Sequence, residues 1–168
     1  MDPVTVALLS GALGGASGEA VRGIWEAAGR RWFDRYFTDH APAAVAAGET
    51  NTIEFLSHLA LRVESLESTA PAALKAGLSD PDFAQTLRAA LLAAARTSDA
   101  TKRSVLARAI SERLAAGAES PEAAIATMAV AAVPTLGRRH LEILGTLAVL
   151  HAVRPEGLPL PQSPPEGG

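Results

Sequence analysis

The sequence predicts an all-α protein, a helical bundle of about six helices that is followed by a disordered, proline-rich C-terminal tail. Apolar residues recur at the three- and four-residue spacing of helices along most of the chain. Several segments begin with a Ser or Asp of the kind that caps helices, twice followed by proline. Strand signals are scarce, since neither Asn-Gly nor Asp-Gly hairpin turns occur.

We predict that residues 1–40 form a Gly/Ala- and aromatic-rich helical segment. Its glycines recur at four-residue spacing, which places small side chains on one side of a helix and allows close packing. Five of the seven aromatic residues of the chain follow between positions 25 and 37. These features predict an association surface made of Gly11, Gly14, Gly15, Gly18, Trp25, Trp32 and Tyr36. The alternatives are that the aromatic side chains fill the protein's own core or lie at a membrane interface.

The bundle domain is expected over residues 50–153, and its first helix over residues 51–67. The buried stripe of that helix is predicted to be Ile53, Leu56, Leu59 or Ala60, and Val63. A second helix follows Asp80, which is a good N-cap, and Pro81 suits its first position because proline needs no hydrogen-bond acceptor there. Its stripe is Phe83, Leu87, Leu91 and Ala94.

The next helix is expected to begin at Ser98 or Asp99 and to end near Gly117. Leu106, Ile110 and Leu114 line its buried face, whereas Arg103, Arg108 and Glu112 are expected to face elsewhere.

A further helix follows Ser120 as its cap, with Pro121 in the first turn and Glu122 at its positive end. Pro134 is expected to kink or end it. The predicted buried stripe of this helix is Ile125, Met128, Ala132 and Leu136.

The last helix, from Arg138, is apolar nearly all round, which is typical of the central buried helix of a bundle. Residues 154–168 contain five prolines and end in two glycines. Such a segment cannot bury enough apolar surface to offset its ordering entropy, so we expect a disordered or polyproline-II tail.

Composition argues against several classes of function. The net charge is −3, whereas a general nucleic-acid binder is usually basic, so nucleic acid is an unlikely partner. The absence of cysteine excludes disulfides, thiolate metal sites and a cysteine nucleophile, and it fits a cytoplasmic protein. No secretory signal or membrane-spanning run is recognised in the N-terminal region.

No catalytic, metal or cofactor site is predicted. The glycine-rich run lacks the lysine and the preceding strand of phosphate-binding loops, and its next charge is Glu19. Glu54 and His58 share a helix face, as do His140 and His151, but neither pair is joined by the inward glutamates of a di-iron bundle. We therefore expect neither an enzyme nor a small-molecule substrate.

A weak basic patch is formed by Arg96, Lys102, Arg103 and Arg108. It could meet phosphate or an acidic protein, although a solvated helical face is the more economical interpretation.

One stretch resembles an uncharacterised group of bacterial all-helical proteins. The resemblance covers residues 78–155 and depends on Leu78-Ser79-Asp80-Pro81, on Thr97-Ser98-Asp99 with Lys102, and on Arg113-Leu114. It implies a helical fold and a bacterial origin, and no catalytic residue can be transferred from it.

From these features we expect a non-enzymatic, cytoplasmic module for protein–protein interaction or self-assembly, with the N-terminal helix as its association surface. The first alternative is a peripheral membrane-acting protein that uses the same helix. The second is a helical metal-binding or enzymatic domain.

Overall fold

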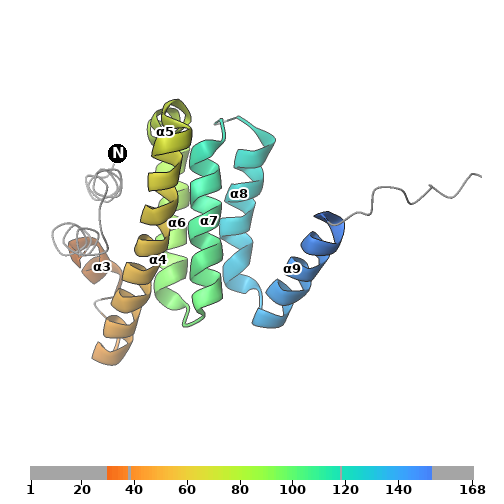
Figure 1. Ribbon diagram of the computed structural model, residues 1–168. Coiled ribbons are helices and arrows are strands. Elements are labelled where there is room, and N and C mark those ends of the chain that lie inside the picture. The colour runs from red at the N-terminus through yellow and green to blue at the C-terminus, as the bar shows by residue number, and fades with distance from the viewer. Residues whose placement is uncertain (1–29, 38, 118, 153–168) are drawn as a thin grey trace, which may run out of the picture. The chain divides into compact units, whose positions relative to one another are not determined.

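The computed structural model describes residues 30–37, 39–117 and 119–152, and in these ranges all regular secondary structure is helical (Figure 1). This confirms the predicted all-α class. The predicted N-terminal glycines and the proline-rich tail lie outside the described residues. The elements are α3 (Arg30–Phe37), α4 (Pro42–Thr69), α5 (Pro71–Leu78), α6 (Pro81–Arg96), α7 (Ala100–Ala115), α8 (Pro121–Ala132), the 3₁₀ turn η2 (Val133–Thr135) and α9 (Arg138–Ala152).

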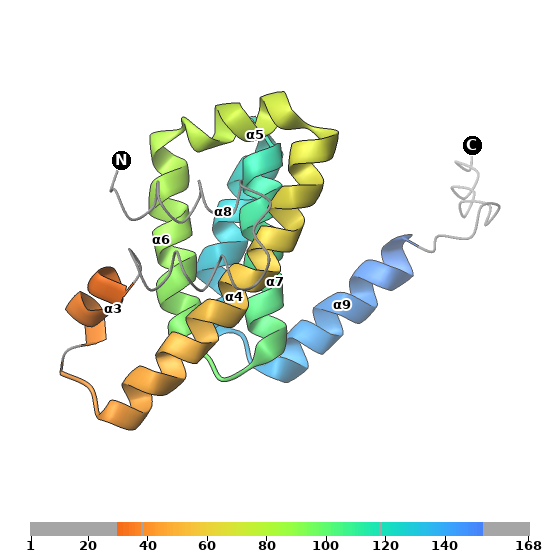
Figure 2. The ribbon, with the colours of Figure 1, turned by 60° about the vertical axis from the view of Figure 1, so that its left-hand side comes forward.

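The chain divides into two compact units, residues 1–135 and residues 136–168. The described part of the first unit holds α3 to α8 and η2, and that of the second holds α9. Within the first unit α7 is central, since α4, α5, α6 and α8 all contact it (Figures 1 and 2).

The N-caps predicted at Asp80 and Ser120 are confirmed by hydrogen bonds, and of the two alternatives Ser98 and Asp99 the structure has Asp99 as the cap of α7. The Asp80 carboxylate accepts from the Asp82 N–H at 3.0 Å, and the Asp99 carboxylate accepts from the Thr101 N–H at 2.9 Å. The Ser120 hydroxyl accepts from the Ala123 N–H at 3.1 Å. Each of these bonds satisfies a donor that the first helical turn leaves without a partner, so local sequence determines where these helices begin.

Two features of the first helices differ from the sequence expectation. α4 begins at Pro42 rather than near residue 51, because the alanine-rich stretch before it continues the same helix. The chain then turns at Ala70, whose φ is −146°, and Pro71 opens the eight-residue helix α5, which the apolar pattern did not reveal.

The core lies between α4, α6 and α7 and includes most of the stripes that the sequence predicted, together with Phe33 and Phe55, which the predicted stripes did not include. The largest fully buried hydrophobic side chains are Phe33, Phe55, Phe83, Leu59, Leu87, Leu106, Ile110, Leu114 and Val63. Ile53 is only partly buried against this core. The predicted faces of α6 and α7 are confirmed, since Phe83, Leu87, Leu91 and Ala94 as well as Leu106, Ile110 and Leu114 are all buried.

α5 packs against the end of α7 at a position where only glycine fits. A β-carbon added to Gly77 would lie 2.7 Å from the carbonyl oxygen of Leu114. Such a contact is too short for real atoms, so the glycine allows α5 to reach the backbone of α7.

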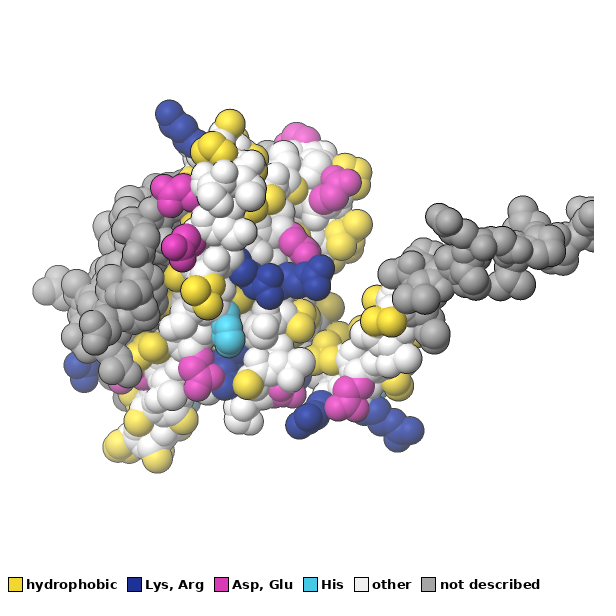
Figure 3. Space-filling view, viewed as in Figure 1, with side chains coloured by type: hydrophobic (Ala, Val, Ile, Leu, Met, Phe, Trp, Pro, Cys, Tyr) yellow, Lys and Arg dark blue, Asp and Glu magenta, His cyan; other side chains and the backbone are white. Residues whose placement is uncertain are grey.

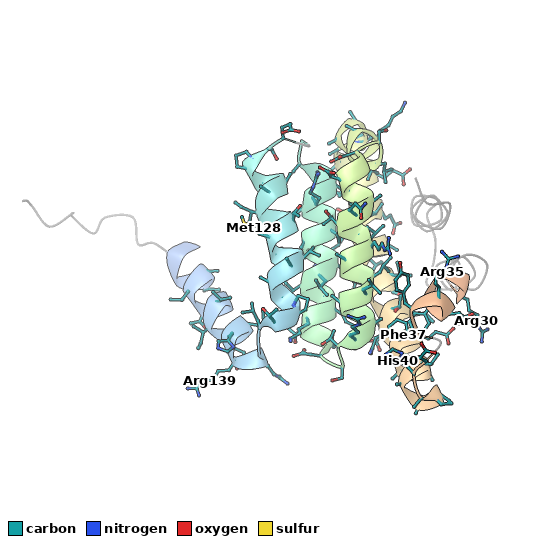
Figure 4. The ribbon with its side chains drawn as sticks, turned by 180° about the vertical axis from the view of Figure 1, so that it is seen from behind. Arg30, Arg35, Phe37, His40, Met128 and Arg139 are labelled. Carbon is teal, nitrogen blue, oxygen red and sulfur yellow. The ribbon has the colours of Figure 1, made fainter. Side chains whose placement is uncertain are left out.

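α3 attaches to the bundle through two stacked phenylalanines. The rings of Phe33 and Phe37 lie 4.2 Å apart and nearly parallel, and both side chains are buried. Phe33 lies over Gly48 of α4, where an added β-carbon would be 2.9 Å from the Cζ atom of Phe33. Phe37 also contacts the ring of His40, as Figure 4 allows the reader to follow.

The predicted inner face of α8 is wrong. Ile125 and Met128 are each 61% exposed, Ala132 is exposed and Leu136 is only half-buried. The buried face instead consists of Ala123, Ala126 and Val130. Small side chains line this face because α8 packs closely along α7, and the larger apolar side chains point the other way.

The last helix was predicted to be the buried centre of the bundle, but α9 belongs to the second unit, whose described part does not bury its apolar side chains. Ile143, Leu144, Leu147 and Val149 of α9 are 49–61% exposed. Apolar character around a helix does not distinguish burial in a core from an apolar surface. Phenylalanine and leucine side chains of α4, α6 and α7 already fill the core of the first unit.

Candidate functional site

The predicted association surface lies mostly outside the described residues. This holds for Gly11, Gly14, Gly15, Gly18 and Trp25 and for the side chain of Trp32, so these predictions stay predictions. Tyr36 is described and is half-buried. Its hydroxyl accepts a hydrogen bond from Nη2 of Arg88, whose guanidinium carbon lies 5.2 Å from the ring centroid. Tyr36 therefore links α3 to α6.

The four residues of the predicted basic patch have different roles. Arg96 and Arg108 are exposed, and Arg108 pairs with Glu112 at 2.7 Å. Lys102 donates to the carbonyl oxygen of Pro134 at 3.2 Å. Arg103 is buried, so these side chains do not present one common basic surface.

The expectation that Arg103 faces away from the buried stripe is wrong. Its guanidinium donates from Nη1 to the carbonyl oxygen of Thr97 at 2.9 Å and from Nη2 to the carboxylate of Glu54. Arg103 precedes Leu106 by three residues, which places it on the same face of α7. The helical spacing could have revealed this position, whereas residue type alone suggested a solvated side chain.

A second buried arginine was missed by the sequence reasoning. Nη2 of Arg113, near the end of α7, donates to Oδ2 of Asp80, and the two side chains are 4% and 9% exposed. Nη1 of Arg113 is buried and has no hydrogen-bond partner within the described part of the chain. Arg113 follows Ile110 by three residues, so the same helical spacing places it on the buried face.

The Glu54 and His58 pair considered from the sequence is not arranged as a metal centre in the described part of the chain. The carboxylate of Glu54 is engaged by Arg103, and His58 is exposed. Nδ1 of His140 accepts from the Gly137 N–H at 3.2 Å, and the side chain of His151 lies outside the described residues. In the ranges that the structure describes, no three potential ligands come together.

The surface of α8 combines exposed apolar side chains with two adjacent hollows. Ile125, Met128 and Ala132 are spaced by three and four residues and form one outward line, which we call the α8 stripe. Figure 4 shows Met128 projecting outward from the helix. Because exposed apolar patches beside hollows are typical of binding surfaces, the α8 stripe is the candidate surface of the first unit.

The hollow on the α6 side of α8 has a volume of about 550 Å³ and that on the α7 side about 360 Å³. The first is lined by Asp82, Gln85, Thr86, Arg113, Glu119, Ser120, Ala123, Ala124, Thr127 and Met128. The second is lined by Glu112, Ala115, Ala116, Glu122 and Ile125. Both hollows therefore combine one side chain of the α8 stripe with two carboxylates.

None of the described helices has both the length and the apolar character that crossing a membrane requires. No curated protein and no solved structure matches the chain. The model of an uncharacterised protein family matches residues 19–161, which is most of the chain and includes every described element. The chain therefore belongs to this uncharacterised family.

Proposed function

We propose that the chain is a non-enzymatic protein–protein interaction or self-assembly module that acts in the cytoplasm. The observation that carries this proposal is the exposure of large apolar side chains on α9. Ile143, Leu144 and Leu147 are 49–56% exposed and share one face of the helix. Contiguous exposed apolar surface is typical of sites that bind another protein.

The length of α9 supports the same proposal. The helix has 15 residues, and isolated helices of that length are marginal in water because most helical stability comes from packing of an apolar face. A second copy of α9, or a helix of a partner, would supply that packing. The predicted N-terminal association surface, from Gly11 to Tyr36, adds a second proposed contact region.

The test is the mass of the full-length protein in solution, measured by size-exclusion chromatography with light scattering over a range of concentrations. The chain mass is 17.3 kDa, and we expect a larger mass that rises with concentration. The double substitution Leu144→Asp and Leu147→Asp should return the protein to the monomer mass. Thr146→Asp is the matched control, because Thr146 is exposed on another side of α9, and it should assemble as the unmodified protein does.

A monomeric protein at every concentration would remove the self-assembly form of the proposal. If the leucine substitutions also lowered its free energy of unfolding, α9 would pack within its own chain, and α9 would no longer support an interaction function.

The second candidate is a peripheral membrane protein. It is favoured by the position of Arg138 and Arg139, which are exposed at the start of α9 beside its apolar side chains. Flotation of the full-length protein with anionic vesicles tests it. Binding that is lost in the Leu144→Asp, Leu147→Asp variant would support this candidate, and absence of binding would remove the α9 form of it.

A further inference from the structure

A helix that packs only in its own core usually directs its large apolar side chains inward, and α8 does the reverse. Ala123, Ala126 and Val130 face inward, whereas Ile125 and Met128, which have larger side chains, are 61% exposed. Burial of large apolar side chains is the main favourable contribution in both folding and association. The apolar side chains of Ile125 and Met128 are therefore not buried within the described part of the first unit.

The two hollows beside α8 give this surface its shape. Met128 lines the hollow on the α6 side and Ile125 lines the hollow on the α7 side. Between them α8 forms a ridge, and each hollow can receive a side chain of a helix that is laid over the ridge. A buried side chain in a pocket is the usual anchor of a protein interface.

The border of this surface is acidic. Asp82 and Glu119 line the first hollow, and Glu112 and Glu122 line the second. Asp82, Glu119 and Glu122 form no ion pair within the residues that the structure describes, whereas Glu112 pairs with the exposed Arg108. Figure 3 shows acidic and hydrophobic side chains side by side over α8.

The nearest buried cation does not cancel this charge. Arg113 lines the first hollow, but its guanidinium already pairs with Asp80, which lies outside the set of lining residues. The pair is neutral in sum, so the carboxylates of Asp82 and Glu119 determine the charge that an approaching molecule meets.

We propose that the α8 stripe and its two hollows bind a basic amphipathic helix of another protein. Apolar side chains of that helix pack on Ile125 and Met128, and its Lys or Arg residues meet Asp82, Glu119 and Glu122. The inference rests on the proposed function as an interaction module and names one surface and the chemistry of its partner.

Two other occupants fit the charge less well. A two-fold contact of this surface with a second copy would bring two acidic borders of the same sign together, and like charges repel. An anionic lipid surface would repel the same carboxylates. A basic helix meets both the apolar ridge and the acidic border, which is why we assign it.

The experiment uses the full-length protein and three fluorescently labelled synthetic peptides. The first has leucine at helical a, d and e spacing and lysine elsewhere, the second has glutamate in place of lysine, and the third is a scrambled form of the first. Fluorescence anisotropy measures each dissociation constant at low and at physiological salt. We expect only the first peptide to bind, and more weakly at higher salt.

Surface substitutions then locate the binding site. Ile125→Ser and Met128→Ser should each weaken binding of the basic peptide by about tenfold, as is typical of interface anchors. Glu119→Gln combined with Glu122→Gln should weaken binding and reduce its salt dependence. Leu61→Ser is the matched control, because Leu61 is a 68% exposed apolar residue of α4, and it should leave the affinity unchanged.

The following outcomes would overturn the inference. The first is equal binding of the acidic or the scrambled peptide, or no binding of the basic peptide. Another is equal weakening by Leu61→Ser, which would mean nonspecific adsorption. Self-association that Ile125→Ser abolishes would identify a second copy as the occupant instead. Backbone NMR shift changes on addition of the basic peptide must include Ile125 and Met128, and changes confined to other helices would also contradict it.

The experiments distinguish an error in the α8 binding site from an error in the proposed interaction function. Assembly through α9 without peptide binding at α8 would leave the interaction module standing and remove only the basic partner. Peptide binding at α8 by a strictly monomeric protein would support the basic partner and exclude self-assembly.

Discussion

Arg113 of α7 donates from Nη2 to Oδ2 of Asp80, the residue whose other carboxylate oxygen caps α6. The two residues are 33 positions apart in sequence, and their side chains are nearly fully buried. One carboxylate thus determines where α6 begins and neutralises a cation inside the bundle. The removal of one partner from such a pair leaves an uncompensated buried charge, whereas the removal of both does not.

We predict that Asp80→Asn lowers the free energy of unfolding by about 3 kcal/mol, because Asn keeps the cap but leaves Arg113 without its counter-charge. The double variant Asp80→Asn, Arg113→Met should recover part of that loss. Urea unfolding followed by circular dichroism measures both. Glu112→Gln, which breaks the exposed Arg108 pair, is the control and should cost at most about 1 kcal/mol. A cost for Asp80→Asn no larger than that of the control would contradict the prediction.

The close approach of α5 to α7 gives a second prediction. Gly77→Ala should lower the free energy of unfolding by about 1–3 kcal/mol, because the new β-carbon would overlap the carbonyl oxygen of Leu114. Gly145→Ala is the matched change in α9, where nothing lies within 4 Å of the added carbon. It should keep or increase helicity, since alanine favours a helix over glycine by up to about 1 kcal/mol. Thermal melts and circular dichroism compare the two, and equal effects would refute the steric explanation.

Because Phe33 of α3 packs directly on Gly48 of α4, we expect substitutions at these two positions to have non-additive effects on the free energy of unfolding. Phe33→Ala should cost about 3–5 kcal/mol, since it empties a buried aromatic site. Gly48→Ala should destabilise the unmodified protein but should be neutral or stabilising once Phe33 is alanine. A double-mutant cycle on the free energies of unfolding measures this coupling. Strictly additive effects would show that the two positions do not compete for the same space.

The orientation of α8 can be tested by one pair of substitutions. Val130→Ala should lower the free energy of unfolding by about 1–2 kcal/mol, because Val130 is 3% exposed. Ile125→Ala removes more carbon but should change stability by no more than about 0.5 kcal/mol, because Ile125 faces outward. The reverse order in urea unfolding would mean that α8 buries the face predicted from the sequence.

Local rules in the sequence predicted most helix starts correctly. Asp80 and Ser120 cap the helices that they were expected to cap, as does Asp99, one of two expected alternatives, because capping depends on one side chain and the next two or three N–H groups. The buried faces of α6 and α7 were also predictable, since these helices contact neighbours in the core along a continuous stripe.

The face of α8 could not be predicted, because hydrophobic periodicity identifies an apolar side without saying whether the protein's own core covers it. The stripe from Ile125 to Ala132 exists as predicted, but it points outward. Helical spacing places Arg103 and Arg113 on the buried face of α7, but it does not identify the carboxylates that pair with them. Arg103 and Arg113 are accommodated only because Glu54 and Asp80, distant in sequence, supply their counter-charges. The predicted N-terminal surface stays a prediction except at Tyr36.

The alanine-lined inner face of α8 has a consequence for motion. Separation of α8 from α7 uncovers only Ala123, Ala126 and Val130 on the α8 side, so we expect its opening to cost less free energy than opening of the helices that carry Phe55 or Phe83. Amide hydrogens of α8 should accordingly exchange early with solvent. A partner bound to the outer face of α8 would disfavour this opening. Its binding should therefore slow amide hydrogen exchange throughout α8.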